Sequence, residues 1–240
     1  MELYKTSLVY DNDLVHYSRF YGVVIRDYAP GIVYQLSQVG TIALDASGKY
    51  NGCINATFNA SNYLWSTSFY NFRNSNISIG AWIKIASPPS NNYTPTLCAI
   101  GQANPRFYIV ISKTTGYVNL YTWDGGALNT NGTFNVCDNA WHHICAVRSG
   151  TSHKMYVDGI ENGSATGTAK DINTTYFYVG RSSDATYDLL GEAYIDDFFI
   201  FKRALTVGEI SLLASNLDLP TINYYRRVRV PGLVSGSWTP

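Results

Sequence analysis

The sequence predicts an all-β protein in which antiparallel sheets pack as a sandwich. Aromatic residues make up 15% of the 240 residues, including 20 tyrosines, whereas the helix former glutamate occurs only four times. Strand formers therefore dominate the composition. From about Ser78 onward, short runs rich in β-branched and aromatic residues alternate with turn residues. This spacing is typical of a sandwich and not of alternating strands and helices.

Alternation and turn residues predict the individual strands. "RFYIVISKTTGYVNLYTWDGG" predicts a hairpin that turns between Lys113 and Gly116, and "HKMYVDGIENG" a second one with a type I′ turn at Asp158 and Gly159. Two further strands are expected in "YFYVG" and "GEAYIDDFFIFKRAL". In "NISIGAWIKI", five apolar side chains alternate on one face of a strand: Ile77, Ile79, Ala81, Ile83 and Ile85.

One short helix is expected after the last strand. Thr206 and Glu209 have the spacing of a capping box, in which each side chain bonds the other residue's backbone N–H. Its apolar residues recur at helical spacing, which predicts a plug that packs against the sandwich. These residues are Val207, Ile210, Leu213 and Ala214.

Residues 216–240 differ in composition from the rest of the chain. They contain three prolines, which central strands do not accommodate, and a basic aromatic stretch. The sequence therefore predicts one domain over residues 1–215 and an extended C-terminal arm over 216–240. The alternation in "INYYRRVRV" favours an arm that pairs with the edge of another subunit, and a disordered tail or one laid along its own domain are the alternatives. The proposed docking residues are Tyr224, Tyr225, Arg226, Arg227 and Arg229.

Charge and cysteine spacing exclude several classes of partner and site. Basic and acidic residues balance at 17 each, so we expect no nucleic-acid partner. No apolar run is long enough to span a bilayer, and the N-terminus does not look like a secretion signal, which predicts synthesis in a cytoplasm without membrane insertion. Four cysteines without C-x-x-C spacing, at positions 53, 98, 137 and 145, indicate buried free thiols.

Four blocks, in order along the chain, resemble the laminin G-like domains of the concanavalin A-like lectin/glucanase superfamily. They are "WHHICAV" at 141–147, "KMYVDG" at 154–159, "YFYVGRSS" at 176–183 and "GEAYIDDFFIFKRALTVGEISLL" at 191–213. "DLVHYSRF" is similar to the opening strand of that family. The resemblance implies a two-sheet antiparallel jelly-roll, with one sheet concave, and places Trp82 and Trp141 in the core. Because this fold carries many functions, it does not by itself assign one.

Carboxylates along the last strand argue against a glycosidase. Glucan-cleaving relatives place two glutamates around an aspartate on one strand face. Here we expect Glu192, Tyr194, Asp196 and Phe198 on one face and Asp197 on the other. The acids therefore do not share one face in the order that such an active site needs. We therefore expect no enzyme activity and no required cofactor.

The same acids are candidates for a structural calcium site. Many relatives hold such an ion at the sheet edge, and the resemblance suggests Asp196 as a ligand, with Asp197 or Asp45 as partners. The alternative is that Asp196 accepts backbone N–H groups and fixes a loop.

One strand has the side chains of a glycan platform. In "GYVNLYTWDGG", Tyr117, Asn119, Tyr121 and Trp123 point to one side, and stacking rings beside amides suit a sugar. The alternative is that this face covers a neighbouring sheet or a partner subunit. Further candidate residues around it are Asp124, Asn129 and Tyr187.

Two adjacent histidines suggest a metal or catalytic site, but their positions along one strand argue against it. His142 and His143 point to opposite faces of one strand, so they cannot hold one metal ion together. We expect Cys145 in the core and Asp158 in its turn. This stretch therefore identifies the fold rather than the function.

Together these observations predict a non-enzymatic structural protein of a virion. We expect a bacteriophage decoration, head-fibre or tail component that is displayed on the particle, docks on other virion proteins through the arm and binds polysaccharide in multiple copies. The alternatives are a carbohydrate-binding module or adhesin of a cellular surface protein, located outside the cell, and a purely architectural domain.

Overall fold

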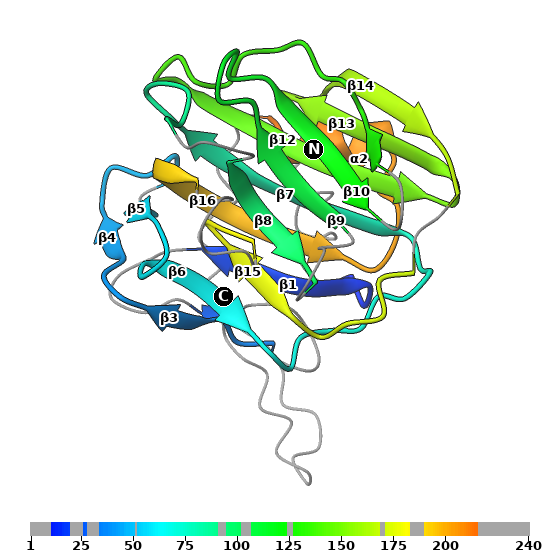
Figure 1. Cartoon of the computed structure of the whole chain (residues 1–240), viewed down its shortest axis with the longest axis horizontal. Coiled ribbons are helices and arrows are strands. Elements are labelled where there is room, and N and C mark those ends of the chain that lie inside the picture. The colour runs from blue at the N-terminus through cyan, green and yellow to red at the C-terminus, as the bar shows by residue number, and fades with distance from the viewer. Residues whose placement is uncertain are drawn as a thin grey trace, which may run out of the picture.

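The computed structural model describes residues 11–19, 26–27, 34–50, 52–90, 95–101, 107–123, 127–168, 171–182 and 190–215. They form two antiparallel sheets packed face to face, with one short helix, α2 (Val207–Leu213), in the described part of the chain (Figure 1). The predicted fold class is thus confirmed. The predicted arm at 216–240 lies outside the described residues.

The larger sheet has nine strands, seven of them in the order β14-β13-β12-β7-β16-β1-β2, while β5 also pairs with β16 and β4 with β5. The predicted opening strand is β1, which pairs with β16 from the other end of the domain. The strands are β14 (Ile160–Thr166), β13 (Ser152–Val157), β12 (Trp141–Ser149), β7 (Ile77–Lys84), β16 (Gly191–Phe201), β1 (Leu14–Arg19), β2 (Arg26–Asp27), β5 (Cys53–Phe58) and β4 (Ala43–Asp45).

The smaller sheet has seven strands in the order β11-β10-β9-β8-β15-β6-β3. β15 lies between β6 and β8, so a segment from late in the chain separates two strands from its first half. The strands are β11 (Ala127–Asn129), β10 (Val118–Trp123), β9 (Phe107–Ile111), β8 (Thr96–Ile100), β15 (Phe177–Val179), β6 (Tyr63–Ser66) and β3 (Ser37–Val39).

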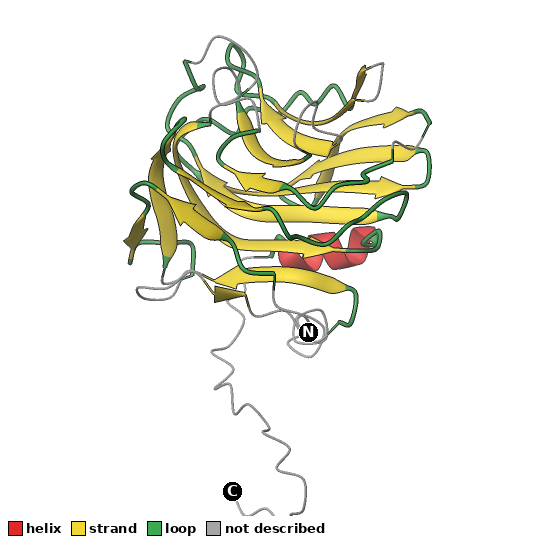
Figure 2. Cartoon of the chain, turned by 60° about the horizontal axis from the view of Figure 1, so that its bottom comes forward, coloured by secondary structure: helices red, strands yellow, loops and turns green. Residues whose placement is uncertain are grey.

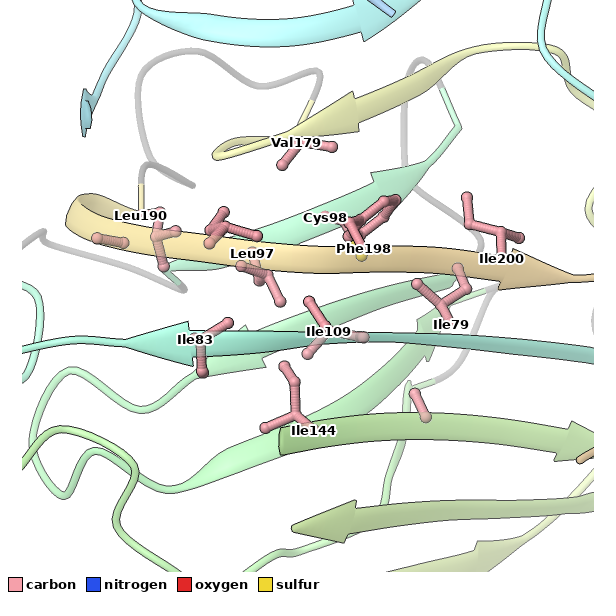
Figure 3. Packing of buried hydrophobic residues seen from close by; sticks show 14 of the residues in the cluster. Ile79, Ile83, Leu97, Cys98, Ile109, Ile144, Val179, Leu190, Phe198 and Ile200 are labelled. Carbon is pink, nitrogen blue, oxygen red and sulfur yellow. The ribbon is translucent and has the colours of Figure 1, made fainter. Parts of the chain in front are cut away.

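The main core fills the space between the sheets. Ile83 and Ile144 of the larger sheet face Ile109 of the smaller one, and all three are completely buried (Figure 3). Burial of apolar side chains on this scale is the dominant favourable term in folding. The five alternating residues predicted on one face of β7 all belong to this core.

A second apolar cluster lies on the outer side of the larger sheet, beneath α2. Figure 2 shows the helix in red beside the strands. Its Ile210 is completely buried in this cluster, which also contains Cys145 and Phe199. Thr206 and Glu209 form the predicted capping box. The predicted helical plug is confirmed for Ile210 and Leu213, whereas Val207, also predicted to pack, is 57% exposed. The helix covers one end of the outer face of the larger sheet.

The two predicted hairpins are present with the expected turn geometry. Gly116 has φ +69° between β9 and β10. Asp158 and Gly159 have φ values of +50° and +83° between β13 and β14, as a type I′ turn requires.

The prediction that Asp196 and Phe198 share one face of β16 was wrong. Asp197 has φ +46° in a bulge between Asp196 and Phe199, and this extra residue reverses the alternation. Phe198 therefore belongs to the main core and does not share a face with Asp196.

Within the described part of the chain, no helix has the length and apolar character needed to span a lipid bilayer.

Candidate functional site

Four large aromatic residues lie in one row across the outer face of the seven-stranded sheet. Tyr121 is paired with Tyr108, Tyr108 with Ala99, Ala99 with Tyr178, and Tyr178 with Trp65, which takes the row from β10 to β6. Four steps between neighbouring strands span about 19 Å. We call Tyr121, Tyr108, Tyr178 and Trp65 the outer aromatic row.

The row faces away from the core because its neighbours along each strand point inward. Leu64, Ile109, Leu120 and Val179 flank the four aromatic residues and all belong to the main core. Since successive side chains of a strand point to opposite faces, the four rings lie on the outer surface.

At the β6 end, the rings form a packed cluster. Trp65 stacks on Tyr178, with ring centroids 6.3 Å apart and an angle of 24° between the planes. Tyr63 contacts both rings, and the Arg181 guanidinium lies 4.4 Å from the centroid of Tyr63. Tyr178 is buried, whereas Trp65 and Tyr63 stay partly exposed, so the cluster is a fixed surface with two accessible rings.

At the β10 end, a second pair of rings is accessible. Tyr108 and Tyr121 are partly exposed and have centroids 5.0 Å apart. Partial burial raises the pKa of the Tyr121 hydroxyl, which therefore stays protonated at neutral pH. Asn129 of β11 pairs with Tyr121 and adds a partly exposed amide at the end of the row.

The seven strands of this sheet contain no aspartate or glutamate. The outer aromatic row thus has no strand carboxylate beside it that could act as acid, base or nucleophile. Its rings, hydroxyls and amides can bind a ligand, but they offer no carboxylate pair for hydrolysis.

A protein-family comparison identifies the superfamily. The family model described as "Concanavalin A-like lectin/glucanases superfamily", of the laminin G type, matches residues 58–211. That match covers more than half of the chain. The protein contains a laminin G-like domain of the concanavalin A-like superfamily. A search of curated protein sequences gives no match.

Solved structures share the fold of the laminin G-like domain. The binding domain of Paraclostridial Mosquitocidal Protein 1 has a TM-score of 0.68 and 17% identity, with 84% of this chain and 52% of that chain covered. The binding domain of Botulinum Neurotoxin DC, solved in complex with SialylT, has a TM-score of 0.66 and 13% identity over 85% and 51%. The receptor-binding domain of Botulinum Neurotoxin Type G has a TM-score of 0.66 and 13% identity, with 84% of this chain and 51% of that chain covered. The chain spans about half of each neighbour, and at such identities the likeness shows a lectin-like fold alone.

The strand predicted to bind glycan is β10 together with Tyr117, the residue before it. Its predicted side chains lie in different environments. Tyr121 joins the outer aromatic row, and Asn129 lies beside it. Asn119 is buried, and its side-chain oxygen accepts a hydrogen bond from the Gly132 N–H. Tyr117 is partly exposed, and its backbone forms an isolated bridge to Asn135.

The remaining residues predicted around this strand carry no side-chain description. Trp123 pairs through its backbone with Ala127, but its side chain lies outside the described part of the structure. Asp124 and Tyr187 also lie outside the described residues.

Sequence analysis missed Trp65, Tyr108 and Tyr178. Alternation in "YLWS" and "FYIVI" does place Trp65 and Tyr108 on outer strand faces. What the sequence does not show is that β15 inserts between β6 and β8 and so aligns these rings with Tyr121.

The residues predicted for calcium have backbone partners. Asp196 is buried, and its two carboxylate oxygens accept hydrogen bonds from the N–H groups of Tyr50 at 2.9 Å and Asp197 at 2.8 Å. Asp197 accepts a hydrogen bond from the Tyr17 hydroxyl, and Asp45 from Ser47. Among the described residues, no group of three or more His, Cys, Asp or Glu could hold a metal ion. Calcium binding remains a sequence-based prediction.

The two adjacent histidines have separate environments, as predicted. His142 bridges two carboxylates, with Nδ1 2.8 Å from Asp158 and Nε2 3.0 Å from Asp138. The hydrogen bond to Asp158 raises the pKa of His142, and that to Asp138 adds to it. His143 packs on the outer side of the sheet, stacked on Phe199.

The core assignment of the two tryptophans holds only in part. Trp82 is buried against Tyr50, but on the outer side of the larger sheet, with Lys49 Nζ 4.1 Å from its ring centroid. Trp141 is partly exposed on the same outer face, because it lies at the end of the sheet that α2 does not cover.

Proposed function

We propose that the laminin G-like domain is a non-enzymatic glycan-binding module and that the outer aromatic row is its binding surface. The observation that carries this proposal is the alignment of Tyr121, Tyr108, Tyr178 and Trp65 in one register across five strands. The three accessible rings of the row, Trp65 at one end and Tyr108 and Tyr121 at the other, offer stacking positions for the C–H faces of an extended sugar chain, while the buried Tyr178 holds Trp65 in place.

The polar groups around the row favour a neutral glycan. Its accessible ends have the Tyr121 hydroxyl and the Asn129 amide, which exchange hydrogen bonds with sugar hydroxyls. The Arg181 guanidinium is buried, donates to the backbone carbonyls of Ser182 and Ala60, and packs on the face of the Tyr63 ring. The superfamily includes lectins, which also supports a sugar ligand.

The lack of strand carboxylates on this sheet supports binding without hydrolysis. Glu192 and Asp196 lie on the larger sheet, and the oxygens of Asp196 already accept two backbone hydrogen bonds. A retaining glycosidase needs two carboxyl groups about 5 Å apart around the scissile bond.

A glycan array tests the proposal. The chain is displayed multivalently, because single-site binding to a shallow row is weak. Trp65→Ala and Tyr121→Ala should each reduce binding about tenfold, since each removes one stacking contact worth about 1.4 kcal/mol. Phe134→Ala removes an exposed ring outside the row and serves as the matched control.

Two results would overturn the proposal. One is wild-type protein that binds no glycan when multivalent. The other is glycan binding that both row variants retain in full while their folds are intact. A protein partner captured through the same rings would instead assign the row to a protein interface, since Tyr and Trp are also enriched there.

For the biological setting, we propose a bacteriophage particle on which many copies display this module. The basic aromatic stretch of residues 216–240 supports docking on another virion protein. Mass spectrometry of purified particles, with full-length chain and with a chain lacking 216–240, tests this setting. Incorporation that needs those residues is the expected result, and incorporation without them would contradict the docking role.

A further inference from the structure

The outer face of the larger sheet carries a second group of accessible rings. Trp141 of β12 is paired with Lys84 of β7, Lys84 with Tyr194 of β16, and Tyr194 with Asn55 of β5. All four side chains are partly exposed. They extend over three strand steps, or about 14 Å. We call Trp141, Lys84, Tyr194 and Asn55 the second row.

The rings of the second row form an open corner. The centroids of Trp141 and Tyr194 are 6.4 Å apart, with an angle of 73° between the planes, and Lys84 Nζ lies 5.6 Å from the centroid of Tyr194. The two rings meet edge to face, and the Lys84 ammonium group beside Tyr194 offers three hydrogen-bond donors.

Hydrogen-bonding groups of both kinds border this corner. Asp45 lies two positions after Ala43 on β4, on the same face of the strand, and Ala43 is paired with Asn55. Hydrogen bonds from Ser47 lower the pKa of Asp45, and Asn55 and Lys84 lower it further, so the carboxylate is ionised at neutral pH. One carboxylate, one ammonium and one amide thus lie beside two rings. This balance of charge suits the hydroxyls of a neutral sugar better than a strongly acidic polymer.

The second row differs from the rest of the outer face of its sheet. The other end is covered by α2, where Ile210 and Leu205 bury the apolar side chains beneath them. At the second row, large rings keep partial exposure beside polar groups. The two rows lie on opposite outer faces, because both sheets bury their inner faces in the same core.

We propose that the second row is a second glycan-binding site, so that one copy of the domain bridges two polysaccharide chains. The choice of a sugar as ligand rests on the proposed function, but the site itself is built from different strands and different residues. The two rows face opposite directions across the core, so one short glycan segment cannot occupy both, and two chains can bind one copy at the same time.

The experiment compares binding of a short oligosaccharide with bridging of the corresponding long polysaccharide. The glycan is the best binder from the array, and the full chain is used. Titration calorimetry with the oligosaccharide should show two sites per chain for the wild type, and Trp141→Ala or Trp65→Ala should each weaken one of the two sites about tenfold and leave the other unchanged. Light scattering with the polysaccharide should show large aggregates for the wild type, and either variant should need about tenfold more protein to form them.

Controls keep the outcomes distinct. Tyr194→Ala provides a second variant if Trp141→Ala fails to fold, and Phe134→Ala should behave like the wild type. If Trp65→Ala weakens binding while Trp141→Ala and Tyr194→Ala keep the wild-type affinities and aggregation, the second site is refuted and the first stands. A wild-type chain that binds no glycan would refute both proposed sites. A dimer of the free protein that Trp141→Ala dissociates, seen by sedimentation, would assign the second row to a self-interface instead.

Discussion

The rings of Trp65 and Tyr178 stack across β6 and β15, with centroids 6.3 Å apart and planes inclined by 24°. Trp65 comes from the first third of the chain and Tyr178 from the last third, so only the completed sheet brings them together. Their roles differ, because Tyr178 is buried while Trp65 is partly exposed. We therefore expect Tyr178 to contribute mainly to the stability of the fold and Trp65 mainly to ligand binding.

We expect Tyr178→Ala to destabilise the fold by about 3 kcal/mol, because it removes a buried aromatic ring that contacts both Trp65 and Tyr63. Trp65→Ala should cost less than about 1.5 kcal/mol, since its ring is partly solvated in the folded state. Urea unfolding measures both, with Tyr178→Phe as the variant that keeps the ring. Equal costs for Trp65→Ala and Tyr178→Ala would mean that Trp65 is mainly a packing residue, and binding tests on it would lose their force.

Local features of this fold could be predicted because their causes are close in sequence. The capping box of Thr206 and Glu209 spans four residues, and the turn at Asp158 and Gly159 needs only two. The buried face of β7 follows from simple alternation. Each of these depends on local geometry, which the sequence encodes directly.

The candidate sites could be predicted only in part because they depend on strand order. Tyr121 could be placed on an outer face from alternation, but its alignment with Tyr178 requires the position of β15 between β6 and β8. Partial exposure of Trp141 depends on where α2 stops covering the sheet. The bulge at Asp197 is a positive-φ conformation at a residue other than glycine, and alternation alone does not reveal it.

Asp196→Asn should destabilise the protein by about 2 kcal/mol. The carboxylate accepts hydrogen bonds from two backbone N–H groups, including that of Tyr50, 146 positions away in sequence. Asparagine has only one side-chain oxygen, so one buried N–H would meet an amide donor instead. Glu192→Gln, at an exposed position of the same strand, is the control and should change the unfolding free energy by less than about 0.5 kcal/mol. An Asp196→Asn protein as stable as the wild type would show that this carboxylate does not fix the bulge.

The stability of the domain should fall as pH rises above the unfolded pKa of histidine. The pKa of His142 is raised in the folded state, first by the hydrogen bond to Asp158, so its stabilising contribution is complete below about pH 6.5 and is lost through the higher folded pKa. Burial raises the pKa of Asp158, but hydrogen bonds from His142 and the His143 N–H outweigh it, and the net pKa is lowered. The contribution of Asp158 is therefore present above about pH 4 and is lost on acidification.

Urea unfolding at about pH 5.5 and about pH 8.5 measures this dependence. The wild type should lose more stability between the two values than His142→Gln, whose side chain does not titrate. Both proteins contain the other three histidines, so the difference between them isolates His142. Identical pH dependence in the two proteins would exclude a charged His142 bridge between Asp138 and Asp158.

All four cysteines should be unreactive in the folded protein. They are free and buried, and burial raises the pKa of Cys53, Cys98 and Cys137 to about 12 and raises that of Cys145 as well. Because the thiolate is the reactive form, a thiol reagent at neutral pH should label the native chain only at the rate of unfolding and label all four sites in denaturant. Val207→Cys supplies a positive control, since Val207 is 57% exposed at the start of α2. Rapid labelling of any native cysteine would show that the sheet around it opens without global unfolding, and the labelled position would identify the least stable part of the core.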